Sequence, residues 1–158
     1  MNKIEIKIRT AVFDDIPNIV EMYRQTVFTV NAKDYSPTQI RVWADGAVNF
    51  PRWEAAIKDQ YFVLAEIEGK LAGFSSIAKD GYLDFMYVSK DYQGCGVATL
   101  LLNEIERKAE EQNNPEIYSH VSKTAKGFFL KMGYVHKEDI SDLYKGELFI
   151  NALMVKKL

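Results

Sequence analysis

The stretch Asp91-Tyr92-Gln93-Gly94-Cys95-Gly96-Val97-Ala98 decides how this chain is interpreted, because it joins an expected strand to an expected long helix. Small residues at positions 94, 96 and 98 let the backbone approach a ligand closely. The free N–H groups at the start of the helix form a ready anion site, whose usual occupant is phosphate. On spacing alone, an ordinary strand-to-helix turn explains the glycines equally well.

Two common nucleotide-binding motifs do not fit this stretch. Gly94 and Gly96 are followed by Thr99 where the dinucleotide fingerprint requires a third small residue, and no βαβ alternation surrounds them. No Lys-Ser or Lys-Thr pair follows at the spacing of a P-loop. We therefore expect the phosphate to belong to another kind of ligand.

The chain on either side of this stretch predicts an α+β domain with a mixed sheet. Ile4, Ile6 and Ile8 alternate with charged residues, which is typical of a half-buried strand. A long antiparallel meander followed by a helical crossover argues against a doubly wound fold or a helical bundle. Helices are expected at about 16–27, 37–43, 51–59, 97–109 and 124–131, and further strands at about 61–67, 71–78, 82–88, 117–121, 134–138 and 147–155.

Length, composition and charge limit the class of protein. A chain of 158 residues with 47% apolar residues suits one domain, 1–158, with a substantial core. The net charge of −2 argues against bulk binding of nucleic acid. The single cysteine, Cys95, cannot form an internal disulfide, and no segment approaches the ~20 apolar residues that cross a bilayer. The start, MNKIEIKIRT, lacks the apolar region of a signal peptide, so we expect a cytoplasmic protein without a membrane partner.

Two motifs carry a resemblance to a known family. Residues 93–98 resemble the Gln/Arg-x-x-Gly-x-Gly/Ala signature of the GNAT N-acetyltransferases, and residues 83–88 look like the fourth strand of that family. Residues 122–134 are similar to its Asn-x-x-Ala-x-x-Phe-Tyr-x-x-x-Gly-Phe segment, and Tyr35-Ser36-Pro37 with Trp43-Ala44 resembles one bacterial branch. The resemblance implies a mostly antiparallel central sheet of about seven strands, flanked by helices and splayed between strands 4 and 5.

The resemblance also implies that acetyl-CoA, the acetyl donor, lies where those two strands separate. The N–H groups of residues 93–98 would hold its pyrophosphate, and the backbone of residues 86–88 would pair with the pantetheine. The N–H of Val88 is the expected partner of the thioester carbonyl. Ser122 stands where the family has Asn, and no metal is expected. The residues expected to bind the donor are Met86, Tyr87, Val88, Gln93, Gly94, Cys95, Gly96, Val97, Ala98, Thr99, Ser122, Ala125 and Phe128.

The acceptor amine must be neutral to attack the thioester, which makes a base useful. With a lysine-like pKa of ~10.4, only about one amine in a thousand is neutral near pH 7. Asp84 is the expected base, because in a regular strand it shares a face with Met86 and Val88; a solvated carboxylate or a turn ligand is the alternative. His120 and Tyr118 are the other candidate catalytic residues, with structural roles as their alternative.

Phe129 departs from the family pattern, since a tyrosine at this position often protonates the leaving thiolate. A thiol pKa of ~8.5 makes thiolate a tolerable leaving group, so this acid is optional. Tyr82, Tyr118, His120 and Tyr134 could replace it, and their spacing does not choose among them.

The resemblance places Tyr23, Phe28 and Trp43 on helices that cover the acceptor pocket, with core packing as the alternative. Two functions follow: transfer of acetyl to an amine of a small molecule or peptide in a ternary complex, or non-catalytic binding of acyl-CoA. A donor with a longer acyl chain is a variant of the first. An open edge at the last strand leaves room for a homodimer.

Overall fold

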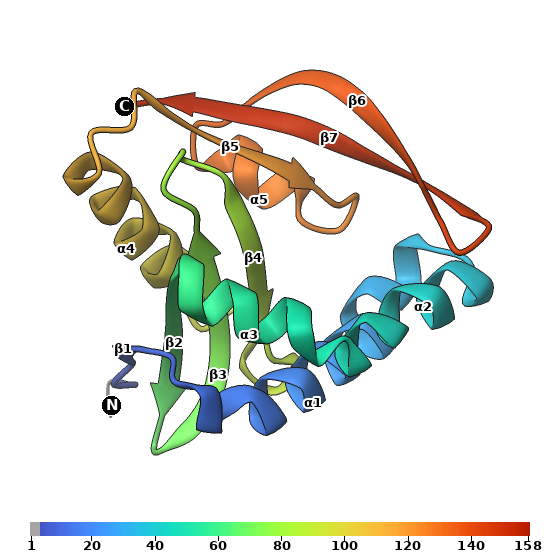
Figure 1. Cartoon of the computed structure of the whole chain (residues 1–158), viewed down its shortest axis with the longest axis horizontal. Coiled ribbons are helices and arrows are strands. Elements are labelled where there is room, and N and C mark those ends of the chain that lie inside the picture. The colour runs from blue at the N-terminus through green and yellow to red at the C-terminus, as the bar shows by residue number, and fades with distance from the viewer. Residues whose placement is uncertain (1–3) are drawn as a thin grey trace.

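The computed structural model describes residues 4–158, which contain seven strands and five α-helices (Figure 1). The first half comprises β1 (Lys7–Thr10), α1 (Ile16–Thr26), a π-helical turn (Val27–Asn31), α2 (Pro37–Ala44) and α3 (Phe50–Asp59). The meander β2 (Tyr61–Ile67), β3 (Lys70–Ile77) and β4 (Leu83–Val88) follows. The chain ends with α4 (Val97–Glu111), β5 (Glu116–Val121), α5 (Lys126–Lys131), β6 (Val135–Tyr144) and β7 (Glu147–Lys157).

The strands form two antiparallel sheets that meet at one end. The first sheet has the order β1-β2-β3-β4, and the second has the order β5-β7-β6. Among the described residues, one parallel bridge, between Tyr82 and Tyr118, joins β4 to β5. Beyond this bridge the two strands separate (Figure 1). The expected seven-stranded arrangement, splayed between the fourth and fifth strands, is therefore confirmed.

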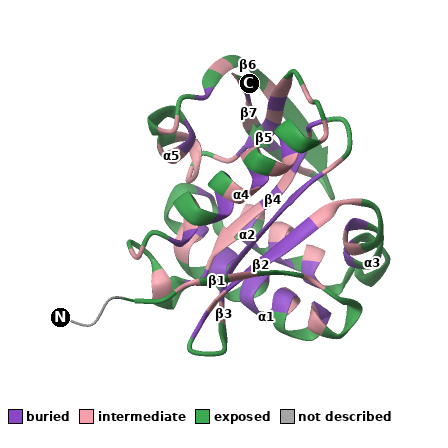
Figure 2. Cartoon of the chain, turned by 90° about the vertical axis from the view of Figure 1, so that its left-hand side faces the viewer, coloured by how far each residue is buried: buried purple, intermediate pink, exposed green. Residues whose placement is uncertain are grey.

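Both faces of the first sheet are buried, because successive side chains of its strands point to opposite faces. Phe62 and Leu64 of β2 pack with α1, α2 and α3, whereas Val63 and Ala65 pack against α4. Figure 2 shows the burial along β2 and β3. Gly73 allows α4 to pack closely against β3, since a Cβ atom at this position would lie 2.8 Å from Val97 Cγ1.

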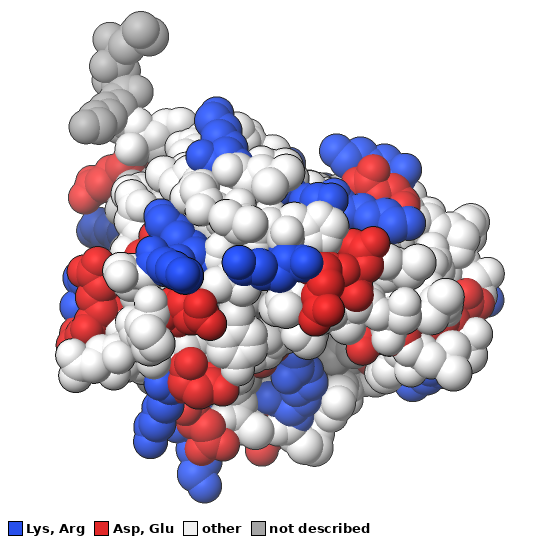
Figure 3. All heavy atoms as spheres, turned by 90° about the horizontal axis from the view of Figure 1, so that it is seen from above, with Lys and Arg blue, Asp and Glu red and all other residues white. Residues whose placement is uncertain are grey.

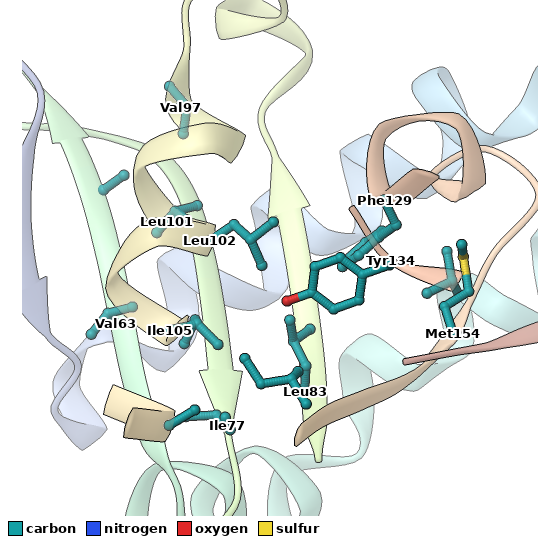
Figure 4. Close-up of a cluster of buried hydrophobic side chains, with 14 of the residues drawn as sticks. Val63, Ile77, Leu83, Val97, Leu101, Leu102, Ile105, Phe129, Tyr134 and Met154 are labelled. Carbon is teal, nitrogen blue, oxygen red and sulfur yellow. The ribbon is translucent and has the colours of Figure 1, made fainter. Parts of the chain in front are cut away.

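Helix α4 belongs to a core that includes both sheets. Leu101, Leu102 and Ile105 on α4 are fully buried, and the same cluster contains Tyr134 and Met154 from the second half of the chain. Figure 4 shows these side chains converging between α4, β4 and the strands that follow. This shared core holds the two separated sheets together.

Three element boundaries differ from the expectation. Strand β1 begins at Lys7, and Ile4 is 53% exposed, because only residues 7–10 pair with β2. Helix α5 begins at residue 126. Strand β6 continues to Tyr144, well beyond residue 138, because it pairs with β7 along its whole length while its side chains are mostly exposed. Residues 140–151 thus form a two-stranded extension beyond β5, called here the β6–β7 ribbon.

The surface seen in Figure 3 carries basic and acidic side chains side by side, as the nearly balanced charge predicts. Within the part of the chain that the structure describes, no helix has both the length and the apolar character that a membrane crossing requires.

Candidate active site

A cavity of about 740 Å³ opens where β4 and β5 separate. Its walls come from β4, the loop into α4, β5 and the start of α5, together with parts of α1, α2, α3 and the β6–β7 ribbon. Of the residues expected to bind the donor, all except Cys95 line this cavity. The elements that carry both sequence motifs therefore line this cavity.

The loop between β4 and α4 presents its backbone to the cavity. Gly94 and Gly96 have φ angles of +74° and +89°, a region that favours glycine, and neither would bring an added Cβ within 4 Å of another group. The first N–H groups of α4 have no partner within the helix, and no side chain caps them at Gly96. The loop can therefore accept an anion such as a phosphate.

The side chains of this loop are mostly structural. The amide of Gln93 donates to the carbonyl oxygens of Val88 and Ser89 at 2.8 and 3.3 Å, which ties the loop to the end of β4. Cys95 Sγ lies 3.7 Å from the carbonyl oxygen of Gln93, and its side chain packs against the α4 core. Because Cys95 does not line the cavity, its expected role in donor binding is limited to its backbone.

The edge of β4 that faces the cavity carries free hydrogen-bond donors. Ser89 N–H donates to the carbonyl of Ala72 on the β3 side at 2.8 Å, and Val88 lies opposite Gly73. Backbone N–H groups alternate in direction along a strand, so those of Met86 and Val88 point away from β3 and towards the separated β5. An extended ligand could pair with this edge as a further strand does.

The opposite wall is formed by the start of α5. Ser122 Oγ accepts a hydrogen bond from Ala125 N–H at 3.2 Å, and Ala125 and Phe128 are partly buried at the cavity. Phe129 is only 2% exposed and packs edge-on against Phe128 and Tyr134, with ring centroids 5.5 and 5.1 Å away. Phe129 is a packing residue without a proton to donate.

Asp84 lines the cavity, but a β-bulge changes its direction. Ser76 pairs with Phe85 and Ile77 pairs with Leu83, so that Asp84 is the extra residue on β4. The expectation that Asp84 shares a face with Met86 and Val88 is therefore wrong. Its carboxylate turns towards α3, where it accepts hydrogen bonds from Arg52 at 2.9 and 3.3 Å and from Gln60 at 2.9 Å.

The two candidate catalytic residues of β5 differ in position. His120 is exposed and lines the cavity, with its ring 5.4 Å from that of Tyr82. Tyr118 lies on the same face, but its hydroxyl donates to Asp80 Oδ2 at 2.6 Å, and Tyr118 does not line the cavity. This hydrogen bond raises the pKa of Tyr118 to about 12. Burial, followed by the charge of Asp84, raises the pKa of Tyr82 to about 12 as well.

Aromatic residues from the helical side are linked by hydrogen bonds. Tyr23 donates to the carbonyl oxygen of Trp43 at 2.8 Å, and Trp43 Nε1 donates to the hydroxyl of Tyr87 at 3.1 Å. All three line the cavity, and burial raises the pKa of Tyr23 and of Tyr87. Phe28 does not line it: this residue is 43% exposed on the outer side of the π-helical turn, beside Arg24, and its expected place in the acceptor pocket is corrected.

Sequence reasoning missed Arg52 and most of the ribbon residues that line the cavity. Arg52 stacks on Phe85 with its Cζ atom 4.6 Å from the ring centroid, and bonds to Asp84. Burial lowers the pKa of Arg52, but its contacts with Asp84 outweigh this effect and raise it. Nothing in the local sequence signals these contacts, which join distant elements. The missed ribbon residues in the wall are Asp142, Tyr144 and Phe149.

Metal-binding side chains do not gather here. Among residues 4–158, no group of three or more His, Cys, Asp and Glu side chains is placed to hold a metal ion.

Residues 31–146 match the family model of the acetyltransferase (GNAT) domain. The chain is 27% identical over 154 residues to the uncharacterized N-acetyltransferase YafP of Escherichia coli (strain K12), covering 98% of this chain and 96% of that protein.

Solved structures show the same fold. A GCN5-related N-acetyltransferase from Rhodopseudomonas palustris superposes with a TM-score of 0.94 at 28% identity, over 100% of this chain and 99% of that one. The PaiA N-acetyltransferase from Thermoplasma acidophilum, solved in complex with coenzyme A, gives a TM-score of 0.79 at 22% identity, over 98% and 99%. With most of its length matched by the family model, this chain belongs to the GNAT acetyltransferase family.

Proposed function

We propose that the protein is an N-acetyltransferase that moves an acetyl group from acetyl-CoA to an amine of a small molecule or peptide. The observation that carries this proposal is the position of two sets of backbone donors in one cavity. The N–H groups of Met86 and Val88 face the gap between β4 and β5, and the glycine loop at the start of α4 opens into the same space. The solved complex of PaiA with coenzyme A supports the same choice of ligand.

Each set of donors has a distinct task in this proposal. The N–H groups of the glycine loop hold the pyrophosphate, and the edge of β4 pairs with the pantetheine. One of the N–H groups of Met86 and Val88 donates to the thioester oxygen as it gains charge during transfer. Phe128 and Ala125 close the opposite wall and exclude water from the thioester.

The transfer itself is a direct attack in a ternary complex. The nitrogen of the neutral amine bonds to the carbonyl carbon, the carbon–sulfur bond breaks, and the sulfur leaves as a thiolate. The proton lost by the nitrogen passes to a base and then to solvent, while the thiolate takes a proton from solvent. Because Asp84 already accepts three hydrogen bonds, we assign the proton transfer to His120, directly or through water.

A second function is favoured by Phe129. With no phenol at this position, the fold could bind acyl-CoA without transferring the acyl group. Binding of CoA is expected for both functions, so turnover has to separate them.

The experiment is release of thiol from acetyl-CoA, measured with a chromogenic thiol reagent across a panel of amines and amino acids. A Cys95→Ala background removes the protein's own thiol from the signal. Release that depends on the acceptor supports the transferase. Silence across the panel, with CoA binding confirmed by calorimetry, contradicts it and supports the binding module.

A further inference from the structure

Arg52 is a cation whose orientation at the cavity is set by three neighbours. Its guanidinium bonds to both oxygens of Asp84 and stacks on Phe85, and Asp84 is itself held by Gln60. The Asp84 side chain is only 7% exposed, whereas that of Arg52 is 50% exposed. The carboxylate thus acts as a buried support that directs a half-exposed guanidinium.

This arrangement leaves part of the guanidinium free for a ligand. Of its five N–H donors, two bond to Asp84, one from each Nη atom. A planar guanidinium recognises carboxylates by paired hydrogen bonds, which an ammonium cannot copy. Arg52 lies in the first turn of α3, whose N-cap residue, Asn49, makes no capping hydrogen bond through its side chain and also lines the cavity. The helix N-terminus adds partial positive charge at the same place.

Arg52 is placed to bind a group of the acceptor that lies close to the reacting amine. Its partner Asp84 precedes Met86 by two residues, so their Cα atoms lie at most about 7 Å apart. The N–H of Met86 is one of the two donors that we place at the thioester. A carboxylate held by Arg52 and an amine at the thioester are therefore separated by a distance that a small molecule can span.

We propose that Arg52 binds the carboxylate of the acceptor, and that the acceptor is an amino acid or a similar small amine that carries a carboxylate. This inference rests on the proposed acetyl transfer. Asp84 is a positioning residue for Arg52 in this arrangement. Asp142 is an exposed carboxylate of the ribbon that also lines the cavity. It would instead favour a cationic acceptor such as a diamine, which is the alternative that the test must exclude.

The test compares acceptors that differ in one group. Glycine, L-leucine and L-phenylalanine are each compared with their carboxamides and with 1,4-diaminobutane, by kcat/KM in the thiol-release assay. For each protein we take the kcat/KM of the acid divided by the kcat/KM of its amide. Dividing this ratio in Arg52→Gln by the same ratio in the parent protein cancels the different basicity of the two amines. We expect this quotient to fall about 10- to 100-fold for at least one amino acid, mainly through KM.

Two further variants control the result. Arg52→Lys keeps a counter-ion for Asp84 but lacks the planar fork, so it should also lose most of the preference for the acid. Arg24→Gln removes an arginine that lies over Phe28, outside the cavity, and should leave the acid-to-amide ratio unchanged. Thermal melting of each variant shows whether it folds.

The outcomes separate this inference from the proposed function. Turnover of 1,4-diaminobutane in preference to every acid, or an acid-to-amide ratio that is unchanged in Arg52→Gln and Arg52→Lys, overturns the carboxylate site and leaves the transferase standing. Calorimetric binding of an amino acid to the CoA-loaded protein, abolished by Arg52→Gln but without any turnover, supports the carboxylate site and contradicts the transferase. If no acid binds and none is acetylated, the carboxylate site is overturned.

Discussion

Asp84 and His120 are both titratable residues of the cavity wall, but their surroundings give them different tasks. Asp84 is bound by Arg52 and Gln60, whereas the His120 ring is exposed to the cavity. We expect His120→Gln to lower kcat at least tenfold, because a base contributes ~10²–10⁴-fold. Asp84→Asn should mainly raise the KM for the acceptor, because it loosens Arg52.

Steady-state kinetics of both variants with one acceptor checks this assignment. Full turnover by His120→Gln, combined with a loss of kcat in Asp84→Asn, would return the role of base to Asp84. His136 offers a control: it pairs with Asp139 and does not line the cavity, so His136→Gln should leave kcat unchanged.

Gly73 is required by packing and not by its backbone angles. An added Cβ would lie 2.8 Å from both Tyr87 O and Val97 Cγ1, so Gly73→Ala forces α4 away from the first sheet. We expect the free energy of unfolding to fall by about 1–3 kcal/mol. Gly127→Ala is the matched control, because this helical position is open: it should raise stability by about 0.5–1 kcal/mol. Urea denaturation of the two variants measures the difference, and equal stability would contradict the crowding at Gly73.

At the scale of elements, β7 has two parts with different support. Residues 152–157 pair with β5, and residues 152–155 of this part also pair with β6, whereas residues 147–151 pair with β6 alone. Phe149 anchors the ribbon by packing on Tyr35 and Trp43, with ring centroids 6.2 and 6.3 Å away. We therefore expect amide hydrogen exchange to be slow in residues 152–157 and markedly faster in residues 140–151. Uniform protection along β6 and β7 would show that the ribbon opens only with the whole domain.

The N–H of Tyr118 ties β5 to the turn between β3 and β4 by donating to the carbonyl oxygen of Gly81 at 3.1 Å. The hydroxyl of Tyr118 adds a side-chain hydrogen bond to Asp80 of the same turn. This bond raises the pKa of Tyr118 to about 12 and lowers that of Asp80. The folded state therefore gains stability that is lost as pH rises from about 10, the ordinary value of tyrosine, to about 12. The stabilisation of the folded state that comes from Asp80 is present above about pH 4 and is lost as the pH falls through the lowered pKa of Asp80.

Ultraviolet difference titration against Tyr118→Phe isolates this phenol. We expect Tyr118 to titrate near 12 in the parent protein and nearer to 10 in Asp80→Asn, where the charged acceptor is absent. A titration near 10 in both proteins would contradict the hydrogen bond.

The elements that the sequence predicts well are those with a local signal. Helices α1 and α4 and strands β2 to β4 follow from hydrophobic periodicity and from turn residues, and the glycine loop follows from its motif. The direction of Asp84 depends on a bulge between two strands, and the role of Arg52 depends on a contact 32 residues away, so neither has a local signature. The prediction ends β6 at residue 138, which is too early, because residues 139–144 are mostly exposed and show no apolar alternation.

For the whole molecule, the main consequence of the splayed fold is that few contacts join its two sheets. Besides the shared core around α4, the Tyr82–Tyr118 bridge is the backbone link between β4 and β5 among the described residues. The proposed donor would contact β4 on one side and residues 122–128 on the other, so its binding should hold the two sheets together. A ligand that binds only the folded state stabilises it by about 2.7 kcal/mol at 100 times its Kd.

We therefore expect CoA at that concentration to raise the melting temperature by about 5–10 °C. Gly96→Ala should abolish most of this rise, because the φ of +89° becomes strained and the loop at the start of α4 must move. Gly69→Ala is the matched control: its φ of +76° imposes a similar strain in the β2–β3 turn, far along the chain from the loop. Both variants should melt lower without ligand, and only Gly69→Ala should regain the full shift with CoA. An equal shift in both would mean that the anion site does not lie at the glycine loop.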